Sequence, residues 1–177
     1  HENTYPYYWS KDFKFEAELY DNSNNNVYLK TTRPSGATAG DFTDYTTAVG
    51  FNSVSDLTYN FQPRSTTNYT YYVWVRARSK NSQTTGMTIS LDGSNSKQIG
   101  CITDANWQWY KYDVNSGAVI SFSSVASLED HVLKITPTNT NLEIDQIHLS
   151  TSSNAIYTSP APCSGVAVPT ITASGPT

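Results

Sequence analysis

Apolar and polar side chains alternate in several short stretches of the chain, as they do in strands with one buried face. In the first stretch, this alternation places Phe13, Phe15, Ala17 and Leu19 on one face. Similar alternation predicts strands at residues 71–78, 87–91, 118–122, 132–135 and 142–149. No window carries the sustained i, i+3, i+4 apolar spacing of an amphipathic helix. The pattern therefore predicts an all-β protein.

Clusters of Gly, Asn, Asp and Ser separate these stretches and are typical of tight turns. The clearest clusters lie at residues 92–95, 115–117 and 138–141. Several short strands joined by such turns favour two antiparallel sheets packed face to face. We therefore expect a β-sandwich of the jelly-roll type.

The length of 177 residues suits one such sandwich with flanking segments. We interpret residues 1–12 as an N-terminal leader that packs on the sandwich, and residues 13–158 as the sandwich itself. Residues 159–177 contain four prolines, and we interpret them as a linker to a following domain. Within the sandwich, residues 31–50 are rich in Thr, Gly and Ala and are weakly periodic. We expect a long loop there, of the kind that often carries binding residues.

Composition narrows the class of protein. Charged residues make up only 15% of the chain and the net charge is −4, which argues against nucleic-acid binding through a basic face. Thr, Ser and Asn account for 60 residues, and most of the aromatic rings are Tyr or Trp. The longest apolar runs are too short to cross a bilayer. These features are typical of an exported β-protein that meets polar ligands.

The two cysteines, Cys101 and Cys163, leave two interpretations open. In an exported protein they would form one disulfide. Otherwise they are separate thiols, one buried and one in the C-terminal segment. No Cys-x-x-Cys pair is present in the sequence, so a cysteine metal site is not expected.

Two pairs of acidic residues stand out because each pair is spaced by two positions. Glu16 and Glu18 lie in the first predicted strand, and Glu143 and Asp145 lie in the last. In a strand, each pair projects from one face. The first pair fits a Ca²⁺ site, the acid/base pair of a glycosidase or an ordinary solvated face. If the first and last strands pair, the two sets meet, and their mutual repulsion favours a bound cation.

The richest aromatic stretch is residues 107–113. A period of two places Trp107 and Trp109 on one face and Tyr110 and Tyr112 on the other, so that one face enters the core. A flat ring with a polar rim suits stacking on a sugar. Trp107 follows a turn-like segment and is expected at a loop–strand junction. We therefore take Trp107 and Trp109 as candidate ligand contacts.

Signals of catalysis are weak. His131 and His148 have no metal-like spacing, and the sequence contains no nucleophile elbow, phosphate-binding loop or dinucleotide-binding glycine motif. An enzyme built on this chain would have to use the clustered carboxylates or His131. The residues alone leave this alternative open.

Six segments, in the same order along the chain, resemble motifs of carbohydrate-binding module families 6 and 35. They are Phe15–Glu18, Tyr72–Arg78, Ile89–Gly93, Trp107–Trp109, Val132–Ile135 and Ile144–Leu149. The resemblance implies a galactose-binding-domain-like β-jelly roll. It also implies a module without catalytic activity that tethers a polysaccharide-degrading enzyme to its substrate.

The resemblance assigns Glu16, Glu18 and Asp145 to the structural Ca²⁺ site between the first and last strands of these modules. Ca²⁺ is therefore the one cofactor that we expect. Committing three acids to a cation brings the effective charge closer to neutral, which suits a neutral polysaccharide.

Three ligand contacts are also implied by position. Trp107 matches the tryptophan that stacks on sugar in these modules, and Tyr28 lies near their second stacking aromatic. Glu143 falls where a polar residue contacts the sugar. The chain departs from the family pattern at Ser55–Leu57, which replaces the usual G-D-W/Y motif.

These inferences lead to one main functional hypothesis and two alternatives. We expect a secreted or cell-surface module that binds a polysaccharide or oligosaccharide, such as a plant cell-wall or algal glycan, and tethers a linked catalytic domain. Residues 169–177 resemble the opening of an Ig-like repeat in secreted Bacteroidetes proteins. No nucleic-acid or membrane partner is expected. The alternatives are a β-sandwich glycan hydrolase or lyase, and an adhesive or structural spacer of a surface protein.

Overall fold

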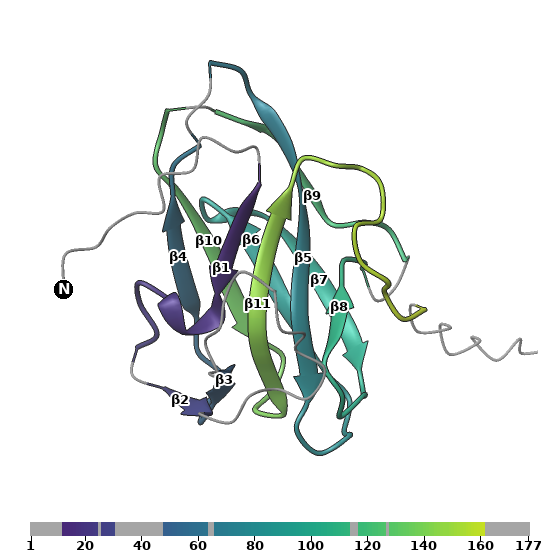
Figure 1. Cartoon of the computed structure of the whole chain (residues 1–177). Coiled ribbons are helices and arrows are strands. Elements are labelled where there is room, and N and C mark those ends of the chain that lie inside the picture. The colour runs from purple at the N-terminus through teal and green to yellow at the C-terminus, as the bar shows by residue number, and fades with distance from the viewer. Residues whose placement is uncertain are drawn as a thin grey trace, which may run out of the picture.

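The described part of the chain forms a sandwich of two antiparallel sheets (Figure 1). The computed structural model describes residues 12–24, 26–30, 48–63, 66–113, 117–126 and 128–161. The predicted all-β class is confirmed, because these ranges contain one short 3-10 helix and no α-helix. Residues 1–11 of the leader, residues 31–47 of the predicted loop and residues 162–177 of the linker lie outside the described residues.

The larger sheet has seven strands with β11 at its centre. They are β1 (Phe13–Glu16), β2 (Val27–Lys30), β3 (Ala48–Phe51), β5 (Tyr69–Ser79), β8 (Gln108–Tyr110), β9 (Ser121–Val125) and β11 (Leu142–Ser150). The strand order is β2-β3-β11-β5-β8, while β1 also pairs with β11 and β9 also pairs with β5. The first and last strands therefore lie side by side, as Figure 1 shows.

The smaller sheet has four strands in the order β4-β10-β6-β7. They are β4 (Leu57–Phe61), β6 (Thr85–Leu91), β7 (Ser94–Ile102) and β10 (His131–Pro137). The turn between β6 and β7 consists of Asp92 and Gly93, whose φ angles of 53° and 71° match the left-handed turn that a two-residue hairpin needs. The turn predicted at residues 92–95 is therefore shorter than expected, because β7 already begins at Ser94.

The core lies between the sheets. All nine residues of β11 are buried, which places polar as well as apolar side chains of this strand out of solvent. The core-facing residues of β5 are those that the alternation predicts, Tyr71, Val73, Val75 and Ala77. Tyr110 and Tyr112 also join the core, so the opposite aromatic face, with Trp107 and Trp109, lies on the outer side of the larger sheet.

The first predicted strand is shorter than expected. β1 ends at Glu16, and residues Ala17–Leu19 form the 3-10 helix η1. Phe13 and Phe15 are buried as predicted, but Leu19 is 62% exposed, so its assignment to the inner face is wrong. A period of two holds only while the backbone stays extended, and a 3-10 turn redirects the side chains that follow.

Alternation also missed β2, β3, β4 and β7. The first three have only four or five residues, and the first five residues of β7 are all exposed, so neither case gives a clear period. β3 includes residues 48–50, so the predicted loop ends earlier than expected. The strand predicted at residues 118–122 is displaced to β9, and only an isolated bridge between Tyr112 and Val119 precedes it.

The chain after β11 continues along the larger sheet toward β8 (Figure 1). Tyr157 packs on Trp109, and the Tyr112 hydroxyl donates a hydrogen bond to the Ala161 carbonyl (3.1 Å). The first residues of the segment interpreted as a linker therefore contact the sandwich. Cys101 of β7 is disulfide-bonded, while Cys163 lies outside the described residues.

Candidate functional site

Pairing of the first and last strands brings acidic residues together on the larger sheet. β1 runs antiparallel to β11 with Glu16 opposite Gln146, whose side-chain amide donates a hydrogen bond to Glu16 Oε1 (3.1 Å). The pairing of β11 with β5 is irregular between Ile144 and Gln146, at the position of Asp145. The first and last strands therefore do pair, and Glu16 lies opposite the residue that follows Asp145.

The surroundings of Glu16 and Glu18 disfavour the charged form of both carboxylates. Glu16 is 2% exposed, and burial, with the negative charges of Glu18 and Asp145, raises its pKa from 4.5 to about 8. Burial and the charge of Asp145 likewise raise the pKa of Glu18 to about 7, although its own backbone amide offsets part of the rise. The alternative of an ordinary solvated face therefore does not hold for Glu16.

This pair of glutamates fits a cation in its chemistry. Glu16 Oε2 is buried and lacks a hydrogen-bond partner within the described residues, and both carboxylate oxygens of Glu18 are buried there without a partner from another residue. Such oxygens are costly without a partner, and carboxylate oxygens are ligands that Ca²⁺ prefers. The side chains are not arranged as a finished site, since no three His, Cys, Asp or Glu residues in the described ranges are placed to hold a metal ion.

Asp145, the third expected ligand, is turned toward Arg76. The two side chains form an ion pair and are only 5–6% exposed. Arg76 lies on β5, next to β11 in the sheet. The protein itself thus supplies a positive partner to the acid that the resemblance assigned to Ca²⁺.

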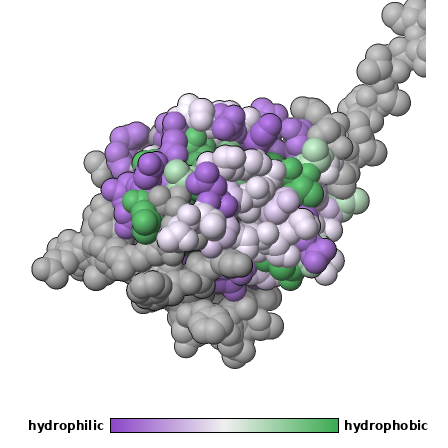
Figure 2. Space-filling view, turned by 90° about the horizontal axis from the view of Figure 1, so that it is seen from above, coloured by the Kyte–Doolittle hydropathy of each residue, from purple (hydrophilic) through white to green (hydrophobic). Residues whose placement is uncertain are grey.

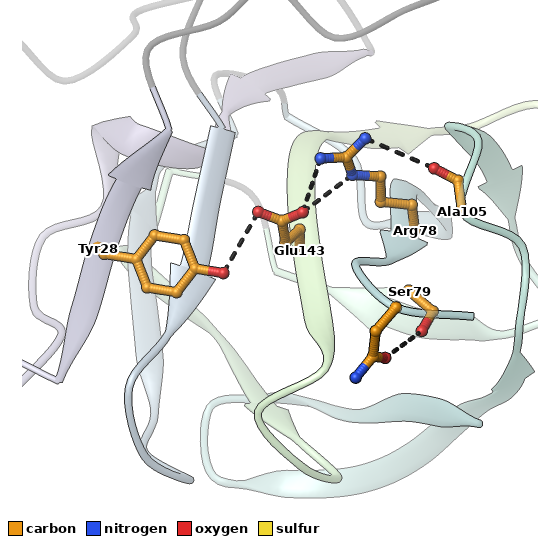
Figure 3. Close-up of polar contacts among 6 residues, drawn as sticks. Tyr28, Arg78, Ser79, Ala105 and Glu143 are labelled. Atoms are coloured by element: carbon orange, nitrogen blue, oxygen red, sulfur yellow. Dashed lines mark hydrogen bonds and ion pairs between the residues drawn. The ribbon is translucent and has the colours of Figure 1, made fainter. Parts of the chain in front are cut away.

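Glu143 belongs to a second cluster, which we call the Glu143 cluster and which comprises Tyr28, Arg78, Trp107 and Glu143. Tyr28 and Arg78 approach the carboxylate from opposite sides (Figure 3). The Tyr28 hydroxyl donates to Oε2 (3.3 Å), while Arg78 Nε donates to Oε1 (2.9 Å) and Arg78 Nη2 lies 2.8 Å from the same oxygen. Burial, with the charge of Glu143, raises the pKa of Tyr28 to about 12, so the hydroxyl stays a donor.

Trp107 completes this cluster at the loop–strand junction directly before β8, as predicted. The Cζ atoms of Arg78 and Arg76 lie 4.7 Å and 5.6 Å from its ring centroid, within reach of a cation–π interaction. Trp107 is only 7% exposed, and its Nε1 has no hydrogen-bond partner among the described residues. Three of the four candidate ligand residues thus come together, and their role in ligand binding stays a prediction.

Trp109, the fourth candidate, lies outside the Glu143 cluster. Its ring stacks flat on Tyr157, with the centroids 3.8 Å apart and the planes at 3°. The Tyr157 hydroxyl lies 2.9 Å from Nδ1 of His148, whose pKa burial lowers to about 4, so that the neutral ring can accept a hydrogen bond. One face of Trp109 is therefore taken up by the protein, and its role in ligand binding also stays a prediction.

Gly50 of β3 is what lets Tyr28 reach Glu143. It pairs with both residues across neighbouring strands. A Cβ atom at position 50 would lie 2.0 Å from Cζ of the Tyr28 ring, which no side chain can tolerate. The sequence analysis treated Gly50 as the end of a loop, although a glycine within a strand often marks such a close approach.

The sequence analysis also missed Arg76 and Arg78 as site residues. A usable signal was present, because the two arginines share the outward face of their strand and are spaced by two, like Glu143 and Asp145. In the structure these residues form two ion pairs between neighbouring strands. Opposite charges at the same spacing on two strands indicate cross-strand ion pairs.

His131 is arranged as a structural rather than a reactive group. Its Nδ1 lies 2.6 Å from Asp92 Oδ2 and its Nε2 lies 2.7 Å from the Ala126 carbonyl. These contacts tie the β6–β7 turn to the start of β10. With both ring nitrogens engaged by protein oxygens, this arrangement does not favour the hydrolase or lyase alternative through His131.

The face of the molecule seen from above is polar, with scattered apolar residues, over its described part (Figure 2). In the view from above, white and purple residues dominate the described surface and the green ones are dispersed (Figure 2). White is the colour of intermediate hydropathy, in keeping with a chain rich in Thr, Ser and Tyr. The described residues contain no helix that is long and apolar enough to span a membrane.

Comparison with known proteins finds likeness in structure rather than in sequence. No family model and no curated protein matches the chain. The C-terminal CBM6 of a laminarinase from Zobellia galactanivorans is 18% identical at a TM-score of 0.52, over 78% of this chain and 98% of that one. A carbohydrate-binding module of Cellvibrio mixtus lichenase 5A, solved with cellotriose, is 17% identical at a TM-score of 0.53, over 79% and 97%.

A third similar structure is a larger enzyme. The GH26-CBM35 β-(1,4)-mannanase of Podospora anserina is 14% identical at a TM-score of 0.54, and the match covers 82% of this chain but only 28% of the mannanase. The chain thus has the fold of CBM6 and CBM35 modules, and the predicted jelly roll is confirmed. At these identities, the likeness establishes the fold alone.

Proposed function

We propose that this chain is a carbohydrate-binding module without catalytic activity of its own, and that it holds a glycan at the Glu143 cluster. One observation carries the proposal. The Glu143 carboxylate is held from both sides by Tyr28 and Arg78, and the Arg78 guanidinium also lies over the Trp107 ring. A sugar presents an apolar C–H face to a ring and hydroxyls to fixed polar groups. The fold shared with carbohydrate-binding modules supports the same class of ligand.

Trp107 must become more accessible before a sugar can stack on it, because only 7% of the residue is exposed in this structure. The proposal therefore includes a movement of side chains around the ring when a glycan binds. The Nε1–H group of Trp107 has no partner among the described residues and is available to a sugar hydroxyl. Glycan binding should consequently change the intrinsic tryptophan fluorescence of the chain.

A glycan panel tests this function directly. The parent chain should bind at least one plant cell-wall or algal polysaccharide, and Trp107→Ala should lose that binding while its circular dichroism spectrum stays unchanged. The control is Tyr72→Ala, which removes an aromatic ring of β5 that lies outside the Glu143 cluster. If Trp107→Ala binds every glycan as the parent does, the site is misplaced.

We further propose that the module belongs to a secreted protein in which it tethers a linked glycan-degrading domain. The absence of catalysis is tested separately, by incubating the isolated chain with each bound polysaccharide and measuring reducing sugar. Release of reducing sugar above the buffer background would instead favour a hydrolase, and unsaturated products absorbing in the ultraviolet would favour a lyase.

We also propose that Glu16 and Glu18 hold a Ca²⁺ ion, with Asp145 as a third acidic ligand. Three buried carboxylate oxygens to which no other described residue donates a hydrogen bond, and the raised pKa values of both glutamates, support this site. Bound Ca²⁺ would balance the negative charges of these carboxylates and would join the first strand to the last. Thermal unfolding with excess Ca²⁺ and with chelator tests this site, because an ion that binds only the folded state raises the unfolding midpoint.

A further inference from the structure

Arg76 contacts two groups that the proposed function assigns to different tasks. Its guanidinium is paired with Asp145, a residue of the acidic cluster. Its Cζ atom also lies 5.6 Å from the centroid of the Trp107 ring, which belongs to the Glu143 cluster. One buried side chain therefore joins Asp145 of β11 to the tryptophan proposed to bind sugar.

Arg78 provides a natural comparison within the same strand. Its guanidinium lies 4.7 Å from the same ring, so it contacts Trp107 at least as closely as Arg76 does. Its acidic partner, however, is Glu143, which hydrogen-bonds to Tyr28 rather than joining the other acids. Of these two arginines, only Arg76 is paired with the acidic cluster.

Asp145 is subject to two competing attractions. It lies on β11 directly before Gln146, the residue that pairs with Glu16 of β1, so its carboxylate belongs to the same region of the sheet as the glutamates. At the same time it is paired with Arg76, and the described acids are not arranged to hold a metal ion. A divalent cation between the glutamates would attract the same carboxylate that the guanidinium now holds.

We propose that Arg76 is a positioning residue that couples cation binding at Glu16 and Glu18 to the placement of Trp107. Asp145 turns from Arg76 toward the glutamates when Ca²⁺ is bound there, and the released guanidinium shifts against the indole ring. This inference rests on the proposed Ca²⁺ site. Coupling between two sites is reciprocal, so a glycan on Trp107 changes the affinity for Ca²⁺ by the same factor as Ca²⁺ changes the affinity for the glycan.

The test uses Ca²⁺ alone as the probe and follows the indole Nε1–H resonances of the full ¹⁵N-labelled chain. Trp107→Phe identifies the resonance of Trp107 among those of the four tryptophans. In the parent chain, Ca²⁺ should shift this resonance more than those of Trp74 and Trp109. Thermal unfolding of the same samples reports whether Ca²⁺ binds.

Two variants separate the arginines. In Arg76→Met, Ca²⁺ should still raise the unfolding midpoint and should bind at least about fivefold more tightly, because the competitor for Asp145 is gone. The shift of the Trp107 resonance should largely disappear. In Arg78→Met, the matched control, the Ca²⁺-induced shift should persist. If Arg76→Met does not fold, Arg76→Lys keeps a positive charge beside Asp145 and should show near-parental Ca²⁺ affinity with a reduced Trp107 shift.

The outcomes are distinguishable. If Ca²⁺ raises the midpoint but the Trp107 resonance does not move, or moves equally in the Arg76 variant, the coupling is wrong and the Ca²⁺ site stands. If Ca²⁺ changes neither the midpoint nor any indole resonance at neutral pH, the Ca²⁺ site is wrong and the coupling falls with it.

Discussion

Two carboxylates of the same sheet stand in opposite situations although both are nearly inaccessible to solvent. Glu143 accepts hydrogen bonds from Tyr28 and Arg78, so its charge is matched by protein donors. Glu16 receives one hydrogen bond from a neutral amide, and burial and neighbouring acids raise its pKa to about 8. Burial alone therefore does not distinguish these acids, whereas their partners do.

The difference separates a prepared polar group from an incomplete one. The Glu143 carboxylate is fixed and neutralised before any ligand arrives, which suits a group that must present a defined geometry to a sugar. In the described part of the chain, Glu16 and Glu18 retain buried oxygens to which no other residue donates a hydrogen bond, and their raised pKa values favour the protonated form. This contrast is what leads us to place the glycan at one cluster and the cation at the other.

The largest expected effect is stabilisation by Ca²⁺. An ion that binds only the folded state at a hundredfold excess over its Kd stabilises it by about 2.7 kcal/mol. For a chain of this size, that corresponds to a rise of about 5–10 °C in the unfolding midpoint. Differential scanning fluorimetry at pH 8, with excess Ca²⁺ and with chelator, measures the shift. An identical midpoint in both conditions, at a Ca²⁺ content below one per chain by atomic absorption, would remove the cation from this cluster.

The next largest effect is the loss of stability expected for Glu143→Gln, which removes the charge that Tyr28 and Arg78 hold. Loss of the charge leaves Arg78 without its acidic partner and should destabilise the protein in the presence of chelator by about 2 kcal/mol. This is less than the loss of about 3–5 kcal/mol for a fully buried pair, because the Arg78 side chain is 16% exposed. Urea unfolding with chelator measures this change. Glu16→Gln, the matched substitution in the acidic cluster, should stabilise the chelated protein by about 1 kcal/mol because it removes a repelled buried acid. The same sign for both variants would contradict the contrast.

The stability of the chain should depend on pH through Glu16 and His148. A folded-state pKa of about 8 for Glu16, against an ordinary 4.5, means that its stabilising contribution is present below pH 4.5 and is lost as the pH rises through 8. The lowered pKa of His148, about 4 against 6.5, acts in the opposite direction, with stability lost as the pH falls from 6.5 toward 4. Between pH 6.5 and 8, Glu16 and Glu18 therefore change the free energy of unfolding with pH, while His148 does not.

In that pH range, and with chelator present, the parent chain should lose stability as the pH rises. The Glu16→Gln variant should lose less stability under the same conditions. Saturating Ca²⁺ should remove the slope, because the bound ion replaces the protons. Urea midpoints at four pH values measure the three curves. A chelated parent whose stability is flat or rises from pH 6.5 to 8 would show that the two glutamates do not hold extra protons in the folded state.

The smallest expected effect is that of Tyr28→Phe. Removing the hydroxyl deletes one hydrogen bond to Glu143 and should cost about 1 kcal/mol of stability, since Arg78 still holds the other oxygen. Gly50→Ala should disturb the same contact without touching the hydroxyl, because the new Cβ displaces the Tyr28 ring. Equal loss of glycan affinity in both variants is expected. Parental affinity in both would exclude Tyr28 from the site.

Alternation along the chain predicted the β-sandwich and the core face of β5, because these depend on where apolar residues fall. It did not predict where the backbone stops being extended, so Leu19 was assigned to the wrong face after the η1 turn. It also lost short strands and the exposed part of β7, where burial imposes no period. Tertiary pairing, not local pattern, forms these elements.

The site was predictable only in part, because local sequence identifies single residues but not the partners that tertiary pairing brings to them. Trp107 was identified from its aromatic stretch, Tyr28 and Glu143 through motif resemblance, and the structure brings the three together. The partners Arg76 and Arg78 depend on the register between β5 and β11, which no single strand encodes. The flat stacking of Tyr157 on Trp109 joins residues 48 positions apart, and nothing in either local sequence indicates it.

The most direct measurement is isothermal titration of the best-binding glycan of the panel into the parent chain, Trp107→Ala and Trp109→Ala. We expect the Trp107 variant to lose at least about tenfold in affinity, equivalent to about 1.4 kcal/mol. The Trp109 variant should bind within about twofold of the parent, because its ring is already stacked on Tyr157. Parental affinity in Trp107→Ala, with the loss appearing in Trp109→Ala instead, would contradict the placement of the glycan at the Glu143 cluster.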